Sequence, residues 1–197
     1  MKQLLVLLLF VTCSVSAQEW QLKKNSRGIK VYTRQLDSSK INEYKAVATV
    51  KTTPEKALKT ITDGDNLWRW NHKTSQSKTV KKISASEFVF WMKNELPWPV
   101  KNRDNVSHIT VNFLAQGDVR IDILPDKTNL VKEREDCIRV TNFKGYWLIS
   151  PKTDGFVEIT QQLYGDPNGQ LPAWLLNSVL TSVPYHSFLN LKEILEN

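Results

Sequence analysis

The C-terminal segment from Gly165 to Asn197 constrains the fold more strongly than any other part of the chain. It opens with the turn-forming run Gly165–Gly169, and Pro172 then suits the first turn of a helix. Apolar or small residues follow at helical spacing along one side: Leu176, Val179, Leu180, Val183, Ser187, Leu191 and Leu195. This pattern predicts a long amphipathic helix with one face that must be buried.

Pro184 lies inside this helical pattern. Because proline has no backbone N–H, it removes one helical hydrogen bond and predicts a kink near Thr181. The apolar stripe continues on both sides of the proline, so we expect one bent helix and not two separate ones.

The buried face of such a helix can be covered in two ways. In the first, the helix packs directly on a sheet and closes a filled core. In the second, helix and sheet are held apart and enclose a cavity for an apolar ligand. The spacing of apolar residues does not distinguish the two, and both remain open at this point.

Most of the chain before this helix has the pattern of β-strands. Between Ile29 and Arg34, for example, apolar and polar residues alternate strictly. The expected strands are 20–23, 29–34, 42–51, 76–84, 87–96, 103–114, 118–124, 137–150 and 155–165. The gaps between the later strands are short and rich in turn residues, which predicts an antiparallel meander.

A helical segment interrupts the strands. Thr53 is a suitable N-cap, Pro54 suits the first helical position, and a helix is expected to run to about Thr62. A second short helical piece is expected over 67–71. The order of elements predicts an α+β fold, in which a curved antiparallel β-sheet wraps around the long C-terminal helix.

The N-terminus has the features of a secretory signal peptide over residues 1–17, with cleavage expected after Ala17. Its apolar run, 4–11, is too short to cross a bilayer. Cleavage would leave a single domain over 18–197, exported to the periplasm or secreted, with Cys137 as its only cysteine. A single thiol cannot form an internal disulfide, so the domain must be stabilised by its own core.

Removal of this segment lowers the formal net charge from +7 by one, because it contains one lysine and no acid. The remaining lysines are dispersed as short pairs, such as Lys23-Lys24, without an Arg-rich helix. This pattern is typical of a solvated surface and does not predict a nucleic-acid partner. Transient contact with an anionic membrane surface is a secondary expectation.

Groups for catalysis are sparse in this sequence. His72, His108 and His186 are far apart, and the sequence contains no HExxH, GxSxG, P-loop or GxGxxG motif. We therefore expect no metal, no cofactor and no catalytic residues. The seven tryptophans are spread over nearly every expected element, which favours rings that fill a core or line a cavity, Trp91 among them.

Three motifs together are more specific than any single residue. They are PWPVKNRD at 97–104, GYWLISP at 145–151 and GDPNGQLPAWLLN at 165–177, preceded by W…GIKVYTR within 20–34. In order and spacing these motifs resemble the START domain, the steroidogenic-acute-regulatory-protein-related lipid-transfer family, across essentially the whole segment after residue 17.

The resemblance implies a helix-grip fold with an internal tunnel that holds one lipid or sterol. It also implies that the 125–136 loop and the start of the last helix act as a lid, and that Arg103 and Asp104 form a structural pair at a turn. In sterol-binding members a buried acid and an arginine lie in the tunnel, and Gln76 and Ile109 occupy those positions here. The residues expected to line the tunnel are Gln76, Trp91, Asn105, Ser107, Ile109, Val111, Leu180, Val183, Ser187 and Leu191.

We therefore predict a monomeric, non-enzymatic protein that binds or transfers a lipid or another hydrophobic small molecule. One alternative is an enzyme on the same scaffold, cyclase-like or hydrolytic, with a titratable cluster in the tunnel. Another is a domain with a filled core that acts as an interaction module.

Overall fold

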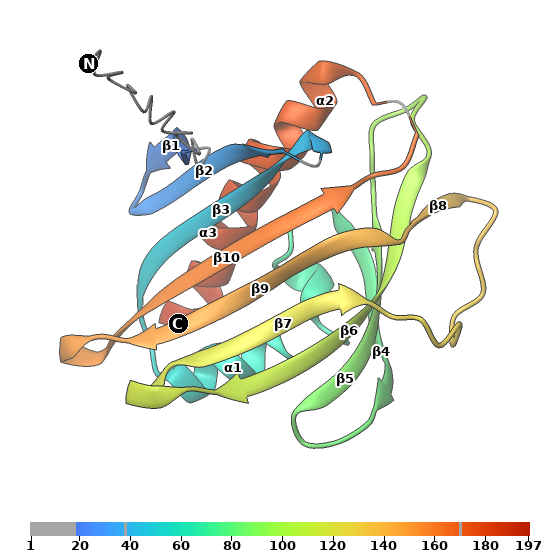
Figure 1. Ribbon diagram of the computed structural model, residues 1–197. Helices are drawn as coiled ribbons and strands as arrows, with labels where there is room; N and C mark the ends of the chain where they lie inside the picture. The colour runs from blue at the N-terminus through green and yellow to red at the C-terminus, as the bar shows by residue number, and fades with distance from the viewer. Residues whose placement is uncertain (1–18, 38, 170) are drawn as a thin grey trace, which may run out of the picture.

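The computed structural model describes residues 19–37, 39–169 and 171–197. The predicted signal peptide, residues 1–17, lies outside these ranges and stays a prediction. The described chain forms one curved sheet with helices against one of its faces (Figure 1).

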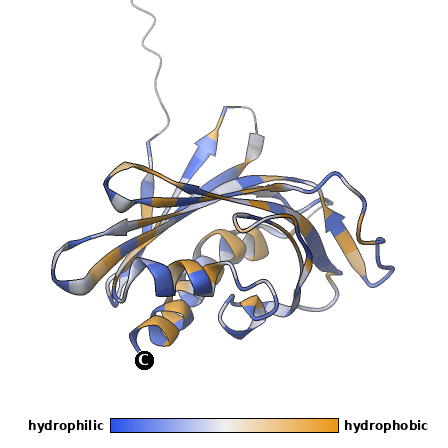
Figure 2. Ribbon diagram, turned by 90° about the horizontal axis from the view of Figure 1, so that it is seen from below, coloured by the Kyte–Doolittle hydropathy of each residue, from blue (hydrophilic) through white to orange (hydrophobic). Residues whose placement is uncertain are grey.

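The sheet has ten strands in the order β1-β2-β3-β10-β9-β7-β6-β5-β4, with β8 paired to β6. The strands are β1 (Gln21–Ser26), β2 (Ile29–Leu36), β3 (Ser39–Lys51), β4 (Thr74–Lys82), β5 (Glu87–Asn94), β6 (Asn102–Phe113), β7 (Val119–Pro125), β8 (Cys137–Val140), β9 (Asn142–Pro151) and β10 (Phe156–Asp166). The sheet bows over the helices in the view of Figure 2. The predicted α+β helix-grip fold is confirmed.

Two features of the sheet differ from a simple meander. First, β10 pairs with β3, so the N-terminal three strands join the later ones through the last strand. Second, the segment expected as one strand over 137–150 breaks at Thr141. Its first part, β8, pairs in parallel with β6, and only β9 continues the antiparallel sheet.

The helix between β3 and β4 forms where its capping residues predict it. In α1 (Pro54–Ile61), the Thr53 Oγ1 accepts a hydrogen bond from the Lys56 backbone N–H at 3.2 Å. Because Pro54 has no N–H, it loses nothing in the first turn. The second helical piece is a single 3₁₀ turn, η1 (Leu67–Arg69), shorter than the predicted 67–71.

The terminal helix is continuous but changes its winding in the middle. It consists of α2 (Ala173–Asn177), a π-helical turn η4 (Ser178–Ser182) and α3 (Val183–Glu196). The wide turn comes directly before Pro184, in the region where the proline removes a hydrogen-bond donor. The predicted single helix is confirmed, and its π-helical turn includes Thr181, the position at which a kink was predicted.

The main core lies where α3 packs against the sheet. Phe188 and Leu191 are each only 1% exposed. The Phe188 ring stacks on Trp147, with ring centroids 5.5 Å apart, and Trp147 meets Trp70 edge-on at 5.8 Å. Side chains fill this end of the space between sheet and helix.

The outer face of the sheet is held by polar contacts between strands. Glu43 on β3 is buried and accepts hydrogen bonds from Arg34 on β2 and from Gln162 on β10, the latter at 2.9 Å. Tyr146 on β9 donates to the Gln162 side-chain oxygen at 3.0 Å. These contacts connect four adjacent strands on the face opposite the terminal helix.

Candidate ligand-binding cavity

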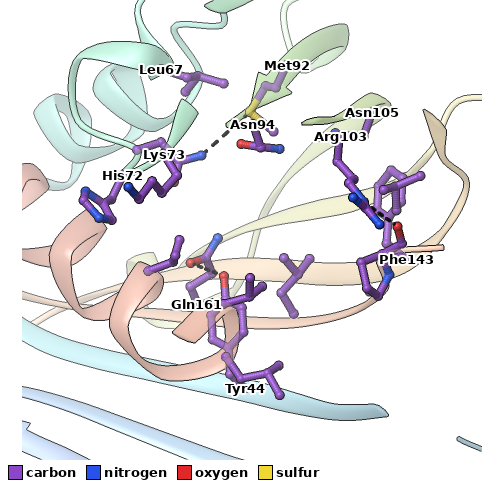
Figure 3. Close-up of a pocket in the computed structure, with 18 of the residues that line it drawn as sticks. Tyr44, Leu67, His72, Lys73, Met92, Asn94, Arg103, Asn105, Phe143 and Gln161 are labelled. Carbon is purple, nitrogen blue, oxygen red and sulfur yellow. Dashed lines mark hydrogen bonds between the residues drawn. The ribbon is translucent and has the colours of Figure 1, made fainter. Parts of the chain in front are cut away.

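A cavity of about 630 Å³ lies between the inner face of the sheet and the first half of the terminal helix. Seven strands (β3 and β5 to β10), the end of α1, η1 and the terminal helix from α2 to the first residue of α3 contribute to its wall. Its buried apolar members include Ile61, Leu67, Trp70, Phe90, Ile109, Ile121, Phe143, Trp147, Leu175 and Leu180. Figure 3 shows part of this wall around the open space.

Strand alternation decides which side chains face the cavity. On β6, Arg103, Asn105, Ser107 and Ile109 lie in the wall, one at every second position. The residues between them point to the outer face, where His108 contacts Glu87 with 2.7 Å between Nε2 and Oε1. His108 therefore lies on the face of β6 opposite the cavity.

Two pairs of polar side chains lie within the otherwise apolar wall. The Tyr44 hydroxyl donates to Gln161 Oε1 at 2.9 Å, as Figure 3 shows, and Asn105 Nδ2 donates to Ser107 Oγ at 2.7 Å. Burial raises the pKa of Tyr44 well above its usual range, so its hydroxyl stays protonated and remains a hydrogen-bond donor. Each pair could orient a polar group of a ligand.

The rim of the cavity consists of the wall residues that are exposed to solvent: Lys73, Glu95, Pro97 and Trp174. Lys73 and Glu95 flank β4 and β5, Pro97 begins the turn to β6, and Trp174 belongs to α2. The side chain of Trp174 is 62% exposed. The rim therefore brings together three segments that are far apart in the sequence.

Arg103 is the buried cation of the wall. Its guanidinium donates to the backbone oxygens of Pro167 at 3.0 Å, Lys101 at 2.5 Å and Asn168 at 2.8 Å. Two of these acceptors belong to the loop that leads into α2, so Arg103 ties this loop to β6. Burial lowers the pKa of Arg103 from its usual value, because it disfavours the charged form.

Asp104 points to the opposite face of β6. It is completely buried and accepts hydrogen bonds from Arg139 on β8, at 2.8 Å, and from Trp91 Nε1 at 2.9 Å. Burial acts to raise the pKa of Asp104, but the hydrogen bonds from Arg139 and Trp91 and the charge of Arg139 outweigh it, and the pKa is lowered. Arg103 and Asp104, predicted as a structural pair, therefore make separate contacts on opposite faces of β6.

His72 belongs to the wall near Lys73 and packs against His186 of α3, with ring centroids 4.9 Å apart. Its backbone N–H donates to Ser187 Oγ at 2.9 Å, which joins this loop to the terminal helix. Burial and the neighbouring His186 and Lys73 lower the pKa of His72, so its neutral form is favoured.

The structure places five of the ten predicted tunnel residues in the wall. They are Asn105, Ser107, Ile109, Leu180 and Val183. Their role in binding a ligand stays a prediction. The other five lie elsewhere, for two different reasons.

Trp91 and Gln76 do not face the cavity. On β5 the inward residues are Phe90 and Met92, so Trp91 between them points outward to Asp104. The prediction assigned the wrong set of alternate residues on this strand to the cavity. Gln76 is exposed on the edge strand β4, next to an irregularity in its pairing with β5 between Thr74 and Gln76. Such a bulge changes the direction of the following side chains.

Val111, Ser187 and Leu191 face inward but lie at the filled end. Val111 and Leu191 belong to the hydrophobic core, and the buried Ser187 hydroxyl lies 3.0 Å from the Asn71 side-chain oxygen. The helix stripe was therefore predicted correctly as a buried face, but only its first half borders open space.

The longer part of the predicted lid, the 125–136 loop, contributes no residue to the cavity wall. It is held on the outer side of β6, where Arg139 donates to the Val131 oxygen at 3.1 Å. The segment before α2 does border the cavity, through Leu171 and Pro167. The turn at Leu96 and Pro97 borders it as well, and the sequence analysis did not assign it there.

Tyr44, Gln161 and Arg103 also belong to the wall, and they were not among the predicted residues. Alternation backwards along β6 from Asn105 would have found Arg103. Tyr44 and Gln161 required the pairing of β3 with β10, which places Ala46 opposite Gln161 and brings Tyr44 next to it.

Within the described ranges, no group of three or more His, Cys, Asp or Glu side chains is placed to hold a metal ion. None of the described helices is both long and apolar enough to cross a membrane. Cys137 is buried and free, and burial together with the charge of Asp136 raises the pKa of its thiol.

The fold and the cavity define a class of protein: a helix-grip protein with a largely apolar pocket between sheet and terminal helix. The chain belongs to the START domain family, whose sequence model matches residues 8–195.

Individual relatives agree with this assignment. The chain is 31% identical to an uncharacterized protein of Pseudomonas aeruginosa, over 91% of this chain and 88% of that protein. It is similar to the STAR-related lipid transfer protein of Xanthomonas axonopodis, with 28% identity, a TM-score of 0.82 and coverage of 90% and 99%. The human phosphatidylcholine transfer protein is 24% identical over 83% of this chain and 78% of its own length.

Proposed function

We propose that this protein binds and transfers a lipid, or a similar hydrophobic small molecule, in the cavity and without catalysis. The observation that carries this proposal is the cavity of about 630 Å³ with its mainly apolar wall. This volume falls within the range of about 300–1,000 Å³ found for small-molecule sites. Membership of the START family and the lipid transfer proteins among its relatives support the same function.

The physical basis for affinity is the removal of hydrocarbon from water. Each buried methylene contributes about 0.8 kcal/mol, so roughly ten methylenes would contribute about 8 kcal/mol before the costs of association. A wall of apolar residues around a few polar groups is sufficient for this, and reactive side chains are not required.

We also propose that the protein contacts a membrane transiently at the rim of the cavity. Trp98, 92% exposed, is next to the rim residue Pro97, and Trp174 of the rim is 62% exposed. Lys73 of the rim and Lys101, close to Trp98 in the sequence, are exposed as well. Tryptophan with neighbouring lysine is the combination favoured at the interface of an anionic bilayer. The predicted signal peptide supports a periplasmic or secreted location.

The enzyme alternative predicts an acid and base cluster that faces the cavity. Of the described residues, the wall contains one histidine, His72, and one carboxylate, Glu95, and they form no ion pair with each other. Glu95 is exposed on the rim. This arrangement supports lipid binding and transfer over catalysis.

Extraction of lipid from vesicles tests the proposal. The protein should remove a fluorescent phospholipid from donor vesicles and deliver it to acceptor vesicles, and native mass spectrometry should detect one bound lipid per chain. A double substitution, Trp98→Ala with Trp174→Ala, should slow transfer while leaving the bound lipid detectable. If the protein neither extracts lipid nor contains any after purification, the proposed function is wrong.

A further inference from the structure

Arg103 is a buried positive charge for which the described residues provide no acidic partner. Its side chain is 5% exposed, and its three hydrogen bonds all go to backbone oxygens, which are dipoles without net charge. No described carboxylate lies within ion-pair distance of its guanidinium. A buried charge without a counter-charge is costly, and the cost is relieved when an anion binds next to it.

The acid adjacent in sequence cannot serve as this partner. Successive side chains of a strand point to opposite faces, so Asp104 lies outside the cavity. There it is already held by Arg139, with 2.8 Å between Nε and Oδ1. The cavity side of β6 is thus left with the cation alone.

The other charged groups of the wall do not offset this cation. Among the described wall residues, Lys73 and Glu95 carry opposite charges and are both exposed on the rim, where water screens them, and His72 favours its neutral form. Arg103 is the buried charge. The cavity therefore favours an anionic group over a cationic one.

The Arg103 guanidinium has N–H groups that make none of these three hydrogen bonds. Arginine carries five N–H groups, and three of them bind the backbone oxygens, one each from Nε, Nη1 and Nη2. One N–H on each terminal nitrogen is left. A carboxylate or a phosphate can accept from such a pair of N–H groups, and charge-assisted bonds of this kind are among the strongest in proteins.

We propose that the ligand carries an acidic head group, a carboxylate or a phosphate, which Arg103 binds in the cavity while the hydrocarbon lies against the apolar wall. This inference rests on the proposed function and names the class of ligand for the same site. Because Arg103 also holds the oxygens of Pro167 and Asn168, the bound head group would lie beside the loop that enters α2. In the view of Figure 3, Arg103 lies apart from the hydrogen-bonded pair Tyr44 and Gln161.

A series of ligands with one hydrocarbon chain and different heads tests the inference. Binding of oleate, oleyl phosphate, oleamide, oleylamine and inorganic phosphate to the protein is measured by isothermal titration calorimetry. Oleate or oleyl phosphate should bind roughly tenfold or more tightly than the neutral oleamide, as expected for hydrogen bonds to a charged group. Whichever of oleate and oleyl phosphate binds more tightly shows whether the head group is a carboxylate or a phosphate. Inorganic phosphate alone should bind weakly because it lacks the hydrocarbon chain.

Variants of Arg103 assign the preference to this residue. Arg103→Gln should reduce the ratio of acid to amide affinity to about one, and Arg103→Lys should retain most of it. Lys30→Gln, which removes an exposed charge on β2 outside the wall, should leave the ratio unchanged. Circular dichroism checks that each variant is folded, and the ligand series with the unaltered protein decides the matter if Arg103→Gln is not.

The outcomes distinguish the preference for an acidic head group from the proposed function as a lipid carrier. Equal binding of oleate and oleamide, or tighter binding of oleylamine, overturns the acidic head group and leaves a lipid carrier in place. An acid preference that persists in Arg103→Gln overturns the role of Arg103. Failure of every chain-bearing ligand to bind overturns the proposed function itself.

Discussion

The two ends of the space between the sheet and the terminal helix differ in how they are filled. Below α3, Phe188, Leu191 and Leu195 interlock with the sheet and are at most 2% exposed. Beside α2 and η4, Leu176 and Val179 border the cavity instead. The two interpretations of the amphipathic helix, filled core and hollow, therefore each hold for one half of the same helix.

The hollow end needs support that its interior does not provide. There the strand ends are held by polar contacts outside the cavity, in particular Asp104 with Arg139 and Trp91, and by Arg103 with the loop before α2. Apolar burial thus predominates at the filled end, whereas hydrogen bonds and an ion pair hold the strands and the loop around the cavity.

The largest effect should come from the filled end. Phe188→Ala removes a ring that is 1% exposed and stacked on Trp147, and it should lower the free energy of unfolding by about 4 kcal/mol. Leu176→Ala, at the hollow end, should cost about 1 kcal/mol because one side of Leu176 already faces open space. Denaturant titration measures both. Equal costs would show that the two ends are packed alike.

The second largest loss of stability should come from the contacts of Asp104, which lie on the outer face beside the hollow end. Asp104→Asn leaves Arg139 without its counter-charge and should cost about 3 kcal/mol of unfolding free energy. Asp122→Asn is the matched control, because Asp122 pairs with Arg120 on the solvated surface, and it should cost less than about 1 kcal/mol. A small loss for Asp104→Asn would mean that the hollow end is held from within.

Enlarging a side chain should destabilise the filled end more than the hollow end, because only the hollow end has space for the added atoms. Val111→Phe overpacks the core and should destabilise the protein by about 2 kcal/mol. Ile109→Phe, two residues away on the same face, projects into the cavity and should change stability by less than about 1 kcal/mol while weakening ligand binding. Thermal unfolding and lipid extraction are the measurements. Unimpaired extraction by Ile109→Phe would contradict the assigned position of the ligand.

The smallest effect concerns pH. The pKa of Asp104 is lower in the folded protein than in the unfolded chain, so its stabilising contribution is complete above the unfolded value of about 4 and is lost as the pH falls through the folded value. Unfolding free energies at pH 6, 4 and 3 should therefore fall less steeply for Asp104→Asn than for the unaltered protein. Parallel profiles would exclude Asp104 as the source of acid sensitivity.

Much of the fold could be predicted because its signals are local. The Thr53-Pro54 cap, the alternation along β2 and the position of Pro184 each depend on neighbours within a few residues. The cavity residues were harder to predict, because facing the sheet's inner side does not distinguish the hollow end from the filled one. Ser187 and Leu180 share one helix face, yet only Leu180 lies in the wall.

The sequence alone determined the order of strands and helices, the buried face of the terminal helix and the family resemblance, since each is written in periodic spacing or in contiguous motifs. Only the tertiary structure decided where the sheet and the helix separate, and which charges are left unpaired there. The pairing of β3 with β10 and the bulge beside Gln76 both depend on contacts between residues that are distant in sequence, so periodic spacing does not encode them.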